Sequence, residues 1–236
     1  MWTIDKFLGG KVLLKQSKSG LRATSDAVLL SAFVKIKENE TLLDVGAGNG
    51  VVGLCINARK KCKLNALECQ TSLIKQIQEN AELNKTDIHI FEHNLFDKKD
   101  ILKGILFHHI VTNPPFYDNT GKGRKNDEQK LAFQAEFDLK KWLDYCLKHL
   151  KSKGSFTMIH RPELLGEILY VLEKKLGKIE IFPIQTKQNQ PATRIILRGV
   201  LGAKSPLKLY PPLVMHKTDG SRSELAEQIL RNGKEM

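Results

Sequence analysis

Short apolar runs alternate with longer amphipathic segments along most of the chain. The run Thr41–Val45 predicts a buried strand, and the stretch after it, Val51–Arg59, predicts a helix. The pattern continues with strands expected at 63–67, at 87–91, in the run ending at residue 112 and at 155–160, and with helices expected at 25–34, 71–83, 138–150 and 162–176. This alternation is typical of a parallel sheet with helices on its faces.

The rhythm changes near the end of the chain. The apolar segments 178–186 and 194–201 are separated only by a loop rich in Gln, Asn and Pro, so they predict an antiparallel pair at the edge of the sheet. Dinucleotide dehydrogenases usually continue with helices at this point. The pattern therefore divides the chain into an N-terminal extension with a helix (1–40), a main α/β domain (41–203) and a C-terminal tail (204–236).

A glycine-rich turn follows the first central strand. Residues 46–53 read Gly-Ala-Gly-Asn-Gly-Val-Val-Gly, and glycines there let the backbone approach a ligand closely at the start of a helix. Glu68 ends the next apolar run, where an acidic residue binds ribose hydroxyls in nucleotide-binding folds. These features fit NAD, FAD and S-adenosylmethionine equally well.

The tetrapeptide Asn113-Pro114-Pro115-Phe116 follows the fourth central strand. The Asn113 side-chain oxygen and the Pro114 carbonyl are two acceptors for the N–H bonds of an exocyclic amine, and Phe116 offers a face for stacking a base. Proline fixes φ and extends the residue before it, so the turn is rigid. The alternative is an ordinary strand-ending turn with an aromatic plug. Ligands gather at the carboxyl ends of strands in open α/β sheets, so this turn and the glycine turn are expected to share one cleft.

Composition restricts the class of protein. The net charge of +12 suggests an anionic partner such as nucleic acid, although a generally lysine-rich composition explains it as well. The four cysteines form no CxxC pair, which predicts neither a metal site nor disulfides. No apolar run reaches membrane-spanning length and the start lacks the order of a signal peptide, so we expect a cytoplasmic protein.

The chain is similar to class I S-adenosylmethionine-dependent methyltransferases, and more narrowly to bacterial tRNA adenine-N6 methyltransferases that act on valine tRNA. The similarity is carried by Asp-Val-Gly-Ala-Gly-Asn-Gly at 44–50, by Asn-Pro-Pro-Phe, by Gly-Leu-Arg-Ala-Thr-Ser-Asp-Ala-Val-Leu-Leu at 20–30 and by tail segments 194–198 and 213–220. It implies a Rossmann-like, seven-stranded, mostly parallel sheet with a terminal antiparallel hairpin. It also implies methyl transfer to N6 of adenosine 37 by a monomer without a metal.

The resemblance assigns roles to individual residues. It implies that Gly46, Gly48 and Gly50 hold the methionine part of the donor, that Asp44 reaches its amino group and that Glu68 binds its ribose. Asn113, Pro114, Pro115 and Phe116 then hold the target base, and Thr24 and Asp26 close the donor pocket. The family often has an acidic residue where this chain has Asn94, which can accept from the donor's adenine amine or simply cap a helix.

The predicted RNA contacts are cations near the same cleft. Lys122, Arg124 and Lys125 follow the tetrapeptide, and Arg161 lies at a strand end, although a solvated loop and an ordinary helix start explain them too. Further cations that extend this track are Lys204, Lys208, Lys217 and Arg222.

Four other functions fit parts of the pattern. Guanine-N2 methyltransferases of ribosomal RNA also carry Asn-Pro-Pro-Phe, and glutamine methyltransferases that modify proteins carry a similar turn with Tyr. An inactive methyltransferase-fold subunit that binds RNA is a third possibility, which the intact glycines, Glu68 and tetrapeptide disfavour. A dehydrogenase is the fourth, and it is distinguished by testing NADH against S-adenosylmethionine for thermal stabilisation.

Overall fold

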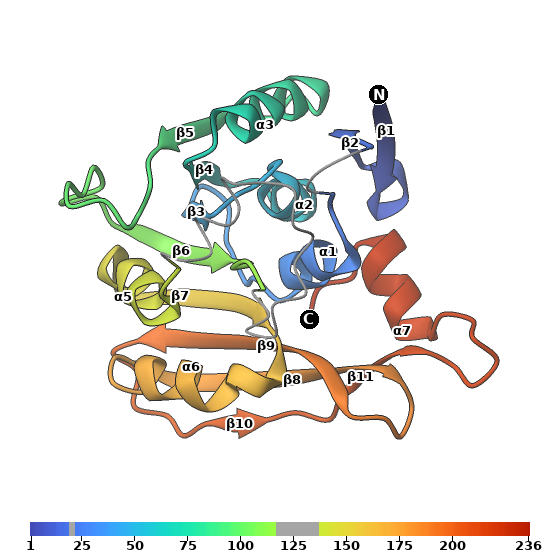
Figure 1. Cartoon of the computed structure of the whole chain (residues 1–236). Coiled ribbons are helices and arrows are strands. Elements are labelled where there is room, and N and C mark those ends of the chain that lie inside the picture. Colours follow the sequence, from blue (N-terminus) through green and yellow to red (C-terminus); the bar gives the residue numbers. More distant parts are fainter. Residues whose placement is uncertain (19–21, 117–136) are drawn as a thin grey trace.

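The computed structural model describes residues 1–18, 22–116 and 137–236, and its centre is a single twisted sheet (Figure 1). Five parallel strands form half of this sheet in the order β5-β4-β3-β6-β7. Their bounds are Thr41–Val45 (β3), Lys63–Glu68 (β4), Ile88–Glu92 (β5), Phe107–Thr112 (β6) and Leu150–His160 (β7). The predicted parallel α/β sheet is therefore confirmed.

In the other half of the sheet, β9 (Ala192–Leu201) runs opposite to its neighbours, whereas β8 (Leu176–Lys187) and the short strands beyond it run in the same direction as β3–β7. β9 lies antiparallel between β7 and β8, which confirms the expected hairpin. The predicted number of seven strands is wrong, because β10 (Lys208–Leu209) and β11 (Leu213–His216) pair with the outer edge of β8 and bring the sheet, as far as the chain is described, to nine. Strands of two and four residues are too short to show a period. They cover backbone groups that an edge strand leaves unpaired.

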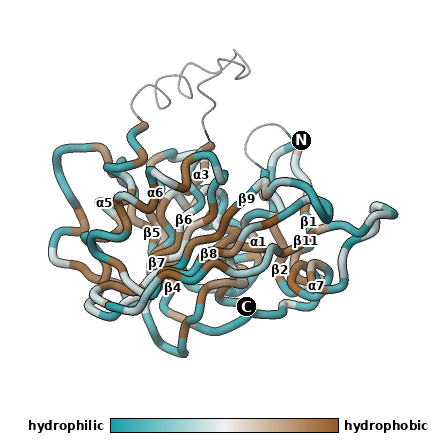
Figure 2. The backbone as a smooth tube through the Cα atoms, turned by 90° about the horizontal axis from the view of Figure 1, so that it is seen from below, coloured by the Kyte–Doolittle hydropathy of each residue, from teal (hydrophilic) through white to brown (hydrophobic). Residues whose placement is uncertain are grey.

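Helices cover both faces of the sheet. On one face lie α1 (Ser25–Ala32) and α2 (Val51–Arg59), and on the other lie α5 (Leu139–Lys148) and α6 (Leu165–Leu172) (Figure 1). Side chains alternate between the two faces, since Leu42 packs with the first pair and Leu43 with the second. The hydrophobic colouring of the central strands in Figure 2 matches this burial on both faces.

Two boundaries differ from the predicted ones. β7 begins at Leu150 rather than 155, because the polar residues 151–154 pass through an irregular pairing with β6 before the regular register starts. The helix expected over 162–176 is a short 3-10 turn, Pro162–Leu164, followed by α6, which ends at Leu172.

An N-terminal hairpin stands beside the sheet. β1 (Trp2–Phe7) and β2 (Val12–Ser17) are joined by the 3-10 turn Leu8–Gly10. Helix α3 (Thr71–Leu83) holds the hairpin, since the side-chain oxygen of Asn80 accepts from the N–H of Lys15 at 2.7 Å. The chain ends in α7 (Glu224–Glu227) and the π-helical turn Gln228–Asn232, which pack on α1. Among the described residues, no helix is both long and apolar enough to cross a lipid bilayer.

Candidate active site

The two motifs singled out in the sequence meet at the carboxyl edge of the sheet. Val45, the last residue of β3, is in register with Thr112, the last residue of β6. The Thr112 hydroxyl also donates to the Val45 carbonyl at 2.8 Å. The glycine turn and Asn113 therefore begin side by side on neighbouring parallel strands, as the argument from strand ends predicts.

The glycine turn is fixed by its own backbone and by a tryptophan. Gly46, Gly48 and Gly50 all have positive φ, at 69°, 60° and 84°, a conformation that L side chains rarely adopt. The N–H of Gly46 donates to the Leu67 carbonyl at 2.9 Å. A Cβ at Gly46 would lie 2.7 Å from the ring of Trp142, so side-chain volume is excluded there as well.

Two buried carboxylates lie behind this turn. Glu68 accepts from the N–H groups of Gly48 at 2.9 Å, Cys69 at 2.9 Å and Gln70 at 3.0 Å. Asp44, which is 2% exposed, accepts from the N–H of Gly53 at 3.2 Å. Burial raises the pKa of Glu68 despite its three donors, and burial, with repulsion from Glu68, raises the pKa of Asp44 to about 7.

These carboxylates indicate the charge of the ligand. Two acidic groups that repel each other in a buried site are stabilised by a cation and destabilised by an anion. A ligand with an ammonium or sulfonium group therefore fits Asp44 and Glu68. The pyrophosphate of a dinucleotide would add negative charge to a site that already holds two acids.

Asn113 supplies the acceptor side of the site. Its side-chain oxygen is buried and has no hydrogen-bond partner among the described residues. An acceptor left buried in this way destabilises the protein by about 1–3 kcal/mol unless a ligand supplies a donor. The N–H of an amine is such a donor. Pro114, which follows, is buried, so the turn is firmly placed.

The ring of Phe116 is held by two side chains from other strands. His160, at the end of β7, meets it edge-on at 5.1 Å between ring centroids. The guanidinium carbon of Arg194, from β9, lies 4.9 Å from the ring centroid. Burial is the largest cause that lowers the pKa of His160 to about 4, so this imidazole is neutral at physiological pH.

A long-range ion pair fixes that arginine. Arg194 Nε donates to Asp26 Oδ2 at 2.7 Å, which joins β9 to the first turn of α1. The carboxylate of Asp26 thus lies beside the Phe116 wall. Sequence reasoning did not assign this role to Arg194 or His160. The available signal was a charged residue at the start of the otherwise apolar run 194–197.

The remaining predicted residues lie as follows. Thr24 is the N-cap residue of α1 and its side chain makes no capping bond. The Asn94 side-chain oxygen accepts from the N–H of Phe96 at 3.1 Å, a local turn just after β5. Arg161 directly follows β7 at the same edge. Lys122, Arg124 and Lys125 lie outside the described residues.

The described part of the chain holds no group of three or more His, Cys, Asp or Glu side chains placed to bind a metal ion.

Curated relatives align with the chain over almost its entire length. The tRNA1(Val) (adenine(37)-N6)-methyltransferase of Haemophilus influenzae (strain PittGG) is 26% identical over 233 residues, which is 94% of each chain. The enzyme of the same name from Photorhabdus laumondii is 22% identical, covering 96% of this chain and 93% of the relative.

Solved structures show the same fold. A protein from Agrobacterium tumefaciens described as a predicted O-methyltransferase superposes with a TM-score of 0.72, at 22% identity, covering 89% of this chain and 97% of the other. A T. thermophilus 16S rRNA guanine-N2 methyltransferase, in complex with AdoMet and guanosine, superposes with a TM-score of 0.62, at 18% identity over 85% of this chain and 50% of the other.

The model of one protein family, the methyltransferase small domain, matches residues 17–189. That range includes the glycine turn, Asp44, Glu68 and the Asn113 tetrapeptide. A methyl donor that carries a sulfonium and an ammonium group also satisfies the cationic ligand inferred from the two buried carboxylates. This chain belongs to the methyltransferase small domain family, whose methyl donor is S-adenosylmethionine.

Proposed function

We propose that this protein methylates N6 of adenosine 37 in the anticodon loop of a valine tRNA, acting as a monomer in the cytoplasm. The observation that carries the proposal is the side-chain oxygen of Asn113, which is buried and has no hydrogen-bond partner among the described residues. Asn113 follows β6 next to the point where the glycine turn follows β3. The full-length relatives that bear this activity in their names support the choice of tRNA. The net charge of +12 suits a polyanionic substrate.

The donor side holds the methyl group in place. Glu68, oriented by three N–H groups, binds the ribose hydroxyls, and Asp44 faces the donor's ammonium group. The positive φ of Gly46, Gly48 and Gly50 keeps Cβ atoms out of the donor's path. S-adenosylmethionine supplies an electrophilic methyl carbon on its sulfonium.

The acceptor side activates the amine without a strong base. The Asn113 oxygen and the Pro114 carbonyl accept the two N–H bonds of the target amine, which orients the nitrogen lone pair toward the methyl group. The N–H bonds become more acidic as nitrogen attacks, so these acceptors bind the transition state more tightly than the ground state. His160 is neutral and meets the Phe116 ring edge-on, which leaves the face of Phe116 for the base.

A second candidate is methylation of N2 of guanine. It is favoured by the likeness to the T. thermophilus rRNA enzyme, which was crystallised with guanosine. Guanine N2 is also an exocyclic amine, and two acceptors suit it equally. The two candidates differ in the nucleoside that is produced.

The test is to incubate the protein with radiolabelled donor and a set of RNA transcripts, then to digest the RNA and identify the labelled nucleoside. We expect N6-methyladenosine in valine tRNA. A matched transcript with guanosine at position 37 is the control, and it should remain unlabelled. Label in N2-methylguanosine would replace the proposal with the second candidate, and no label in any RNA would reject both.

A further inference from the structure

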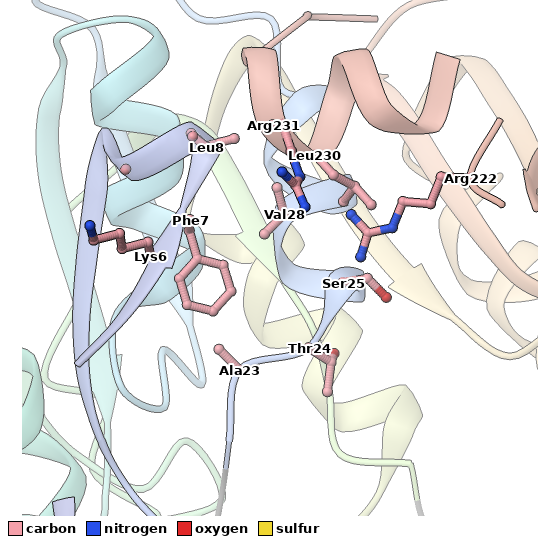
Figure 3. A pocket seen from close by; sticks show the side chains of 12 residues that line it. Lys6, Phe7, Leu8, Ala23, Thr24, Ser25, Val28, Arg222, Leu230 and Arg231 are labelled. Atoms are coloured by element: carbon pink, nitrogen blue, oxygen red, sulfur yellow. The ribbon is translucent and has the colours of Figure 1, made fainter. Parts of the chain in front are cut away.

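A cavity of about 520 Å³ opens next to the start of α1 (Figure 3). It lies between three parts of the chain that are distant in sequence: the tip of the N-terminal hairpin, the segment leading into α1, and the C-terminal helical turns. Its lining residues are Lys6, Phe7, Leu8, Gly9, Gly10, Ala23, Thr24, Ser25, Val28, Arg222, Leu230 and Arg231. The glycine turn, Asp44 and Glu68 do not line it, whereas Thr24, which the family resemblance assigns to the donor pocket, does.

Two guanidinium groups enter this cavity. Figure 3 shows the side chains of Arg222 and Arg231 extending toward each other above Ser25. Glu227 holds both, since one of its oxygens lies 2.8 Å from Arg231 Nε and the other 3.6 Å from Arg222 Nη1. One carboxylate thus orients two cations, and most of their N–H donors face away from it. Two guanidinium groups against one carboxylate leave this part of the cavity positively charged.

The start of α1 adds donors of its own. The N-cap residue, Thr24, makes no side-chain capping bond, and among the described residues no side chain caps the first turn in its place. Thr24 and Ser25 line the cavity, and so does the ring of Phe7. Two guanidinium groups, an uncapped helix start, two hydroxyls and an aromatic face are a set of groups that binds a phosphate and the nucleoside attached to it.

The cavity lies next to the wall of the acceptor site. Ser25 lines the cavity, whereas the following residue, Asp26, binds Arg194 at 2.7 Å, and Arg194 covers the ring of Phe116. The first turn of α1 therefore separates the proposed base site from the cavity. The cavity is thus placed to hold the backbone of a strand whose base lies against Phe116.

We propose that this cavity binds a phosphate group of the RNA strand next to the methylated nucleotide. The inference rests on the proposed RNA methyltransferase function and adds to it a site where the substrate's backbone is held. Arg222 and Arg231 bind the phosphate oxygens, and the helix start contributes N–H donors. The site then positions the target base, because it fixes the strand on one side of Phe116.

The first test is the double variant Arg222→Gln/Arg231→Gln. Its control is Lys60→Gln/Lys61→Gln, which removes the same charge from two exposed residues just before β4 that do not line the cavity. We expect the first variant to bind the tRNA about tenfold more weakly and to reduce the slope of log K against log salt by about one, with donor affinity unchanged. Glu227 is 39% exposed, so it stays hydrated when both partners are lost.

A second variant guards against misfolding. Ser25→Glu places a carboxylate in the first turn of α1, where negative charge favours the helix, and at the same time in the cavity. We expect its melting temperature to equal or exceed that of the wild type while its tRNA binding falls. A loss of binding in a protein of undiminished stability cannot come from unfolding.

The outcomes separate the two proposals. Wild-type RNA binding and salt slope in Arg222→Gln/Arg231→Gln, or an equal loss in the lysine control, would overturn the phosphate site while leaving the proposed function intact. Inorganic phosphate that binds the cavity without competing with tRNA would assign it to a free phosphorylated ligand and reject the inference. A wild-type protein that labels no RNA would reject both.

Discussion

The two sides of the active site differ in how far the protein satisfies its own polar groups. On the donor side, Glu68 accepts three backbone N–H bonds and Asp44 accepts one. On the acceptor side, the Asn113 oxygen is buried with no partner among the described residues. In the proposed assignment, the donor pocket is thus built before its ligand arrives, whereas the acceptor site is completed by the base.

This difference has an energetic meaning. Preformed groups lose little freedom when a ligand binds, which favours affinity for the donor. An unpartnered acceptor gains its hydrogen bond only when the amine is in place, and the gain is greatest as the amine becomes more acidic in the transition state. Changes on the donor side should therefore alter donor affinity, and changes on the acceptor side should alter turnover.

The largest expected effect is that of Asn113→Ala. Loss of the amide oxygen should lower kcat by about 100- to 1000-fold, as removal of one transition-state hydrogen bond does in other enzymes. Donor affinity should stay within about twofold of the wild type, because the contacts of Glu68 and Asp44 remain. A radiolabel assay with saturating tRNA and calorimetry with S-adenosylmethionine measure the two quantities.

Asn113→Asp is the matched control, because it keeps an acceptor oxygen at the same place. It should retain more activity than Asn113→Ala. If the alanine variant turns over at the wild-type rate, residue 113 is not the amine acceptor and the proposed mechanism is wrong.

The next effect, on the donor side, is that of Glu68→Gln. The amide has only one acceptor oxygen, because its other end is an NH₂ group that can only donate. At least one of the three backbone N–H groups is therefore left unpaired, which destabilises the site by about 1–3 kcal/mol. Donor affinity should fall by about 10- to 100-fold, with kcat at saturating donor nearly unchanged. Equilibrium dialysis with labelled donor measures the loss.

Glu92→Gln is the matched control. Glu92 is the last residue of β5, is in register with Glu68 on the neighbouring strand, and is exposed. It should bind the donor normally. Equal losses in both variants would mean that the change acts through general charge and not through the ribose site.

The residues proposed for the donor side and the tetrapeptide can be picked out in the sequence because each motif is local. A turn that needs positive φ favours glycine at Gly46, Gly48 and Gly50, and an amine site at a strand end favours Asn113 followed by prolines. The parallel half of the sheet was equally visible, since its strands and helices are long enough to show their periods.

The rest depends on contacts between distant parts of the chain. Arg194 and Asp26 are 168 residues apart, and nothing near either residue indicates the other. The same holds for the cavity, which needs the hairpin tip, the start of α1 and the C-terminal turns together. The strands β10 and β11 were missed because two and four residues carry too little pattern.

The third effect tests whether Asp26 acts at the donor pocket or beside Phe116. Replacing Arg194 by Gln removes both the cation over Phe116 and the partner of Asp26, and it should lower kcat/KM for tRNA by about tenfold. Donor affinity should not change. Arg194→Lys, which keeps the charge, should recover part of the loss. The family resemblance places Asp26 at the donor pocket, so a loss confined to donor affinity would favour that role over the acceptor wall.

The smallest effect concerns pH and Asp44, whose pKa the fold raises from 3.8 to about 7. Between these two values the native state binds more protons than the unfolded state, so the free energy of unfolding of the ligand-free protein should fall as pH rises through this window and level off above it. Glu68, whose pKa is also raised, contributes in the same direction.

Donor binding should show the opposite slope, because the ammonium group of the donor prefers the ionised carboxylate. A carboxyl with a pKa of about 7 goes from about one-tenth to about nine-tenths ionised between pH 6 and pH 8, so donor affinity should rise by up to about ninefold. Asp44→Asn should flatten both profiles, raising stability above pH 7 and removing the rise in affinity. Thermal unfolding and calorimetry across this range measure the two slopes. A donor affinity in the wild type that is independent of pH would show that Asp44 contributes to the fold but not to the ammonium site, and the donor side would then depend on Glu68 alone.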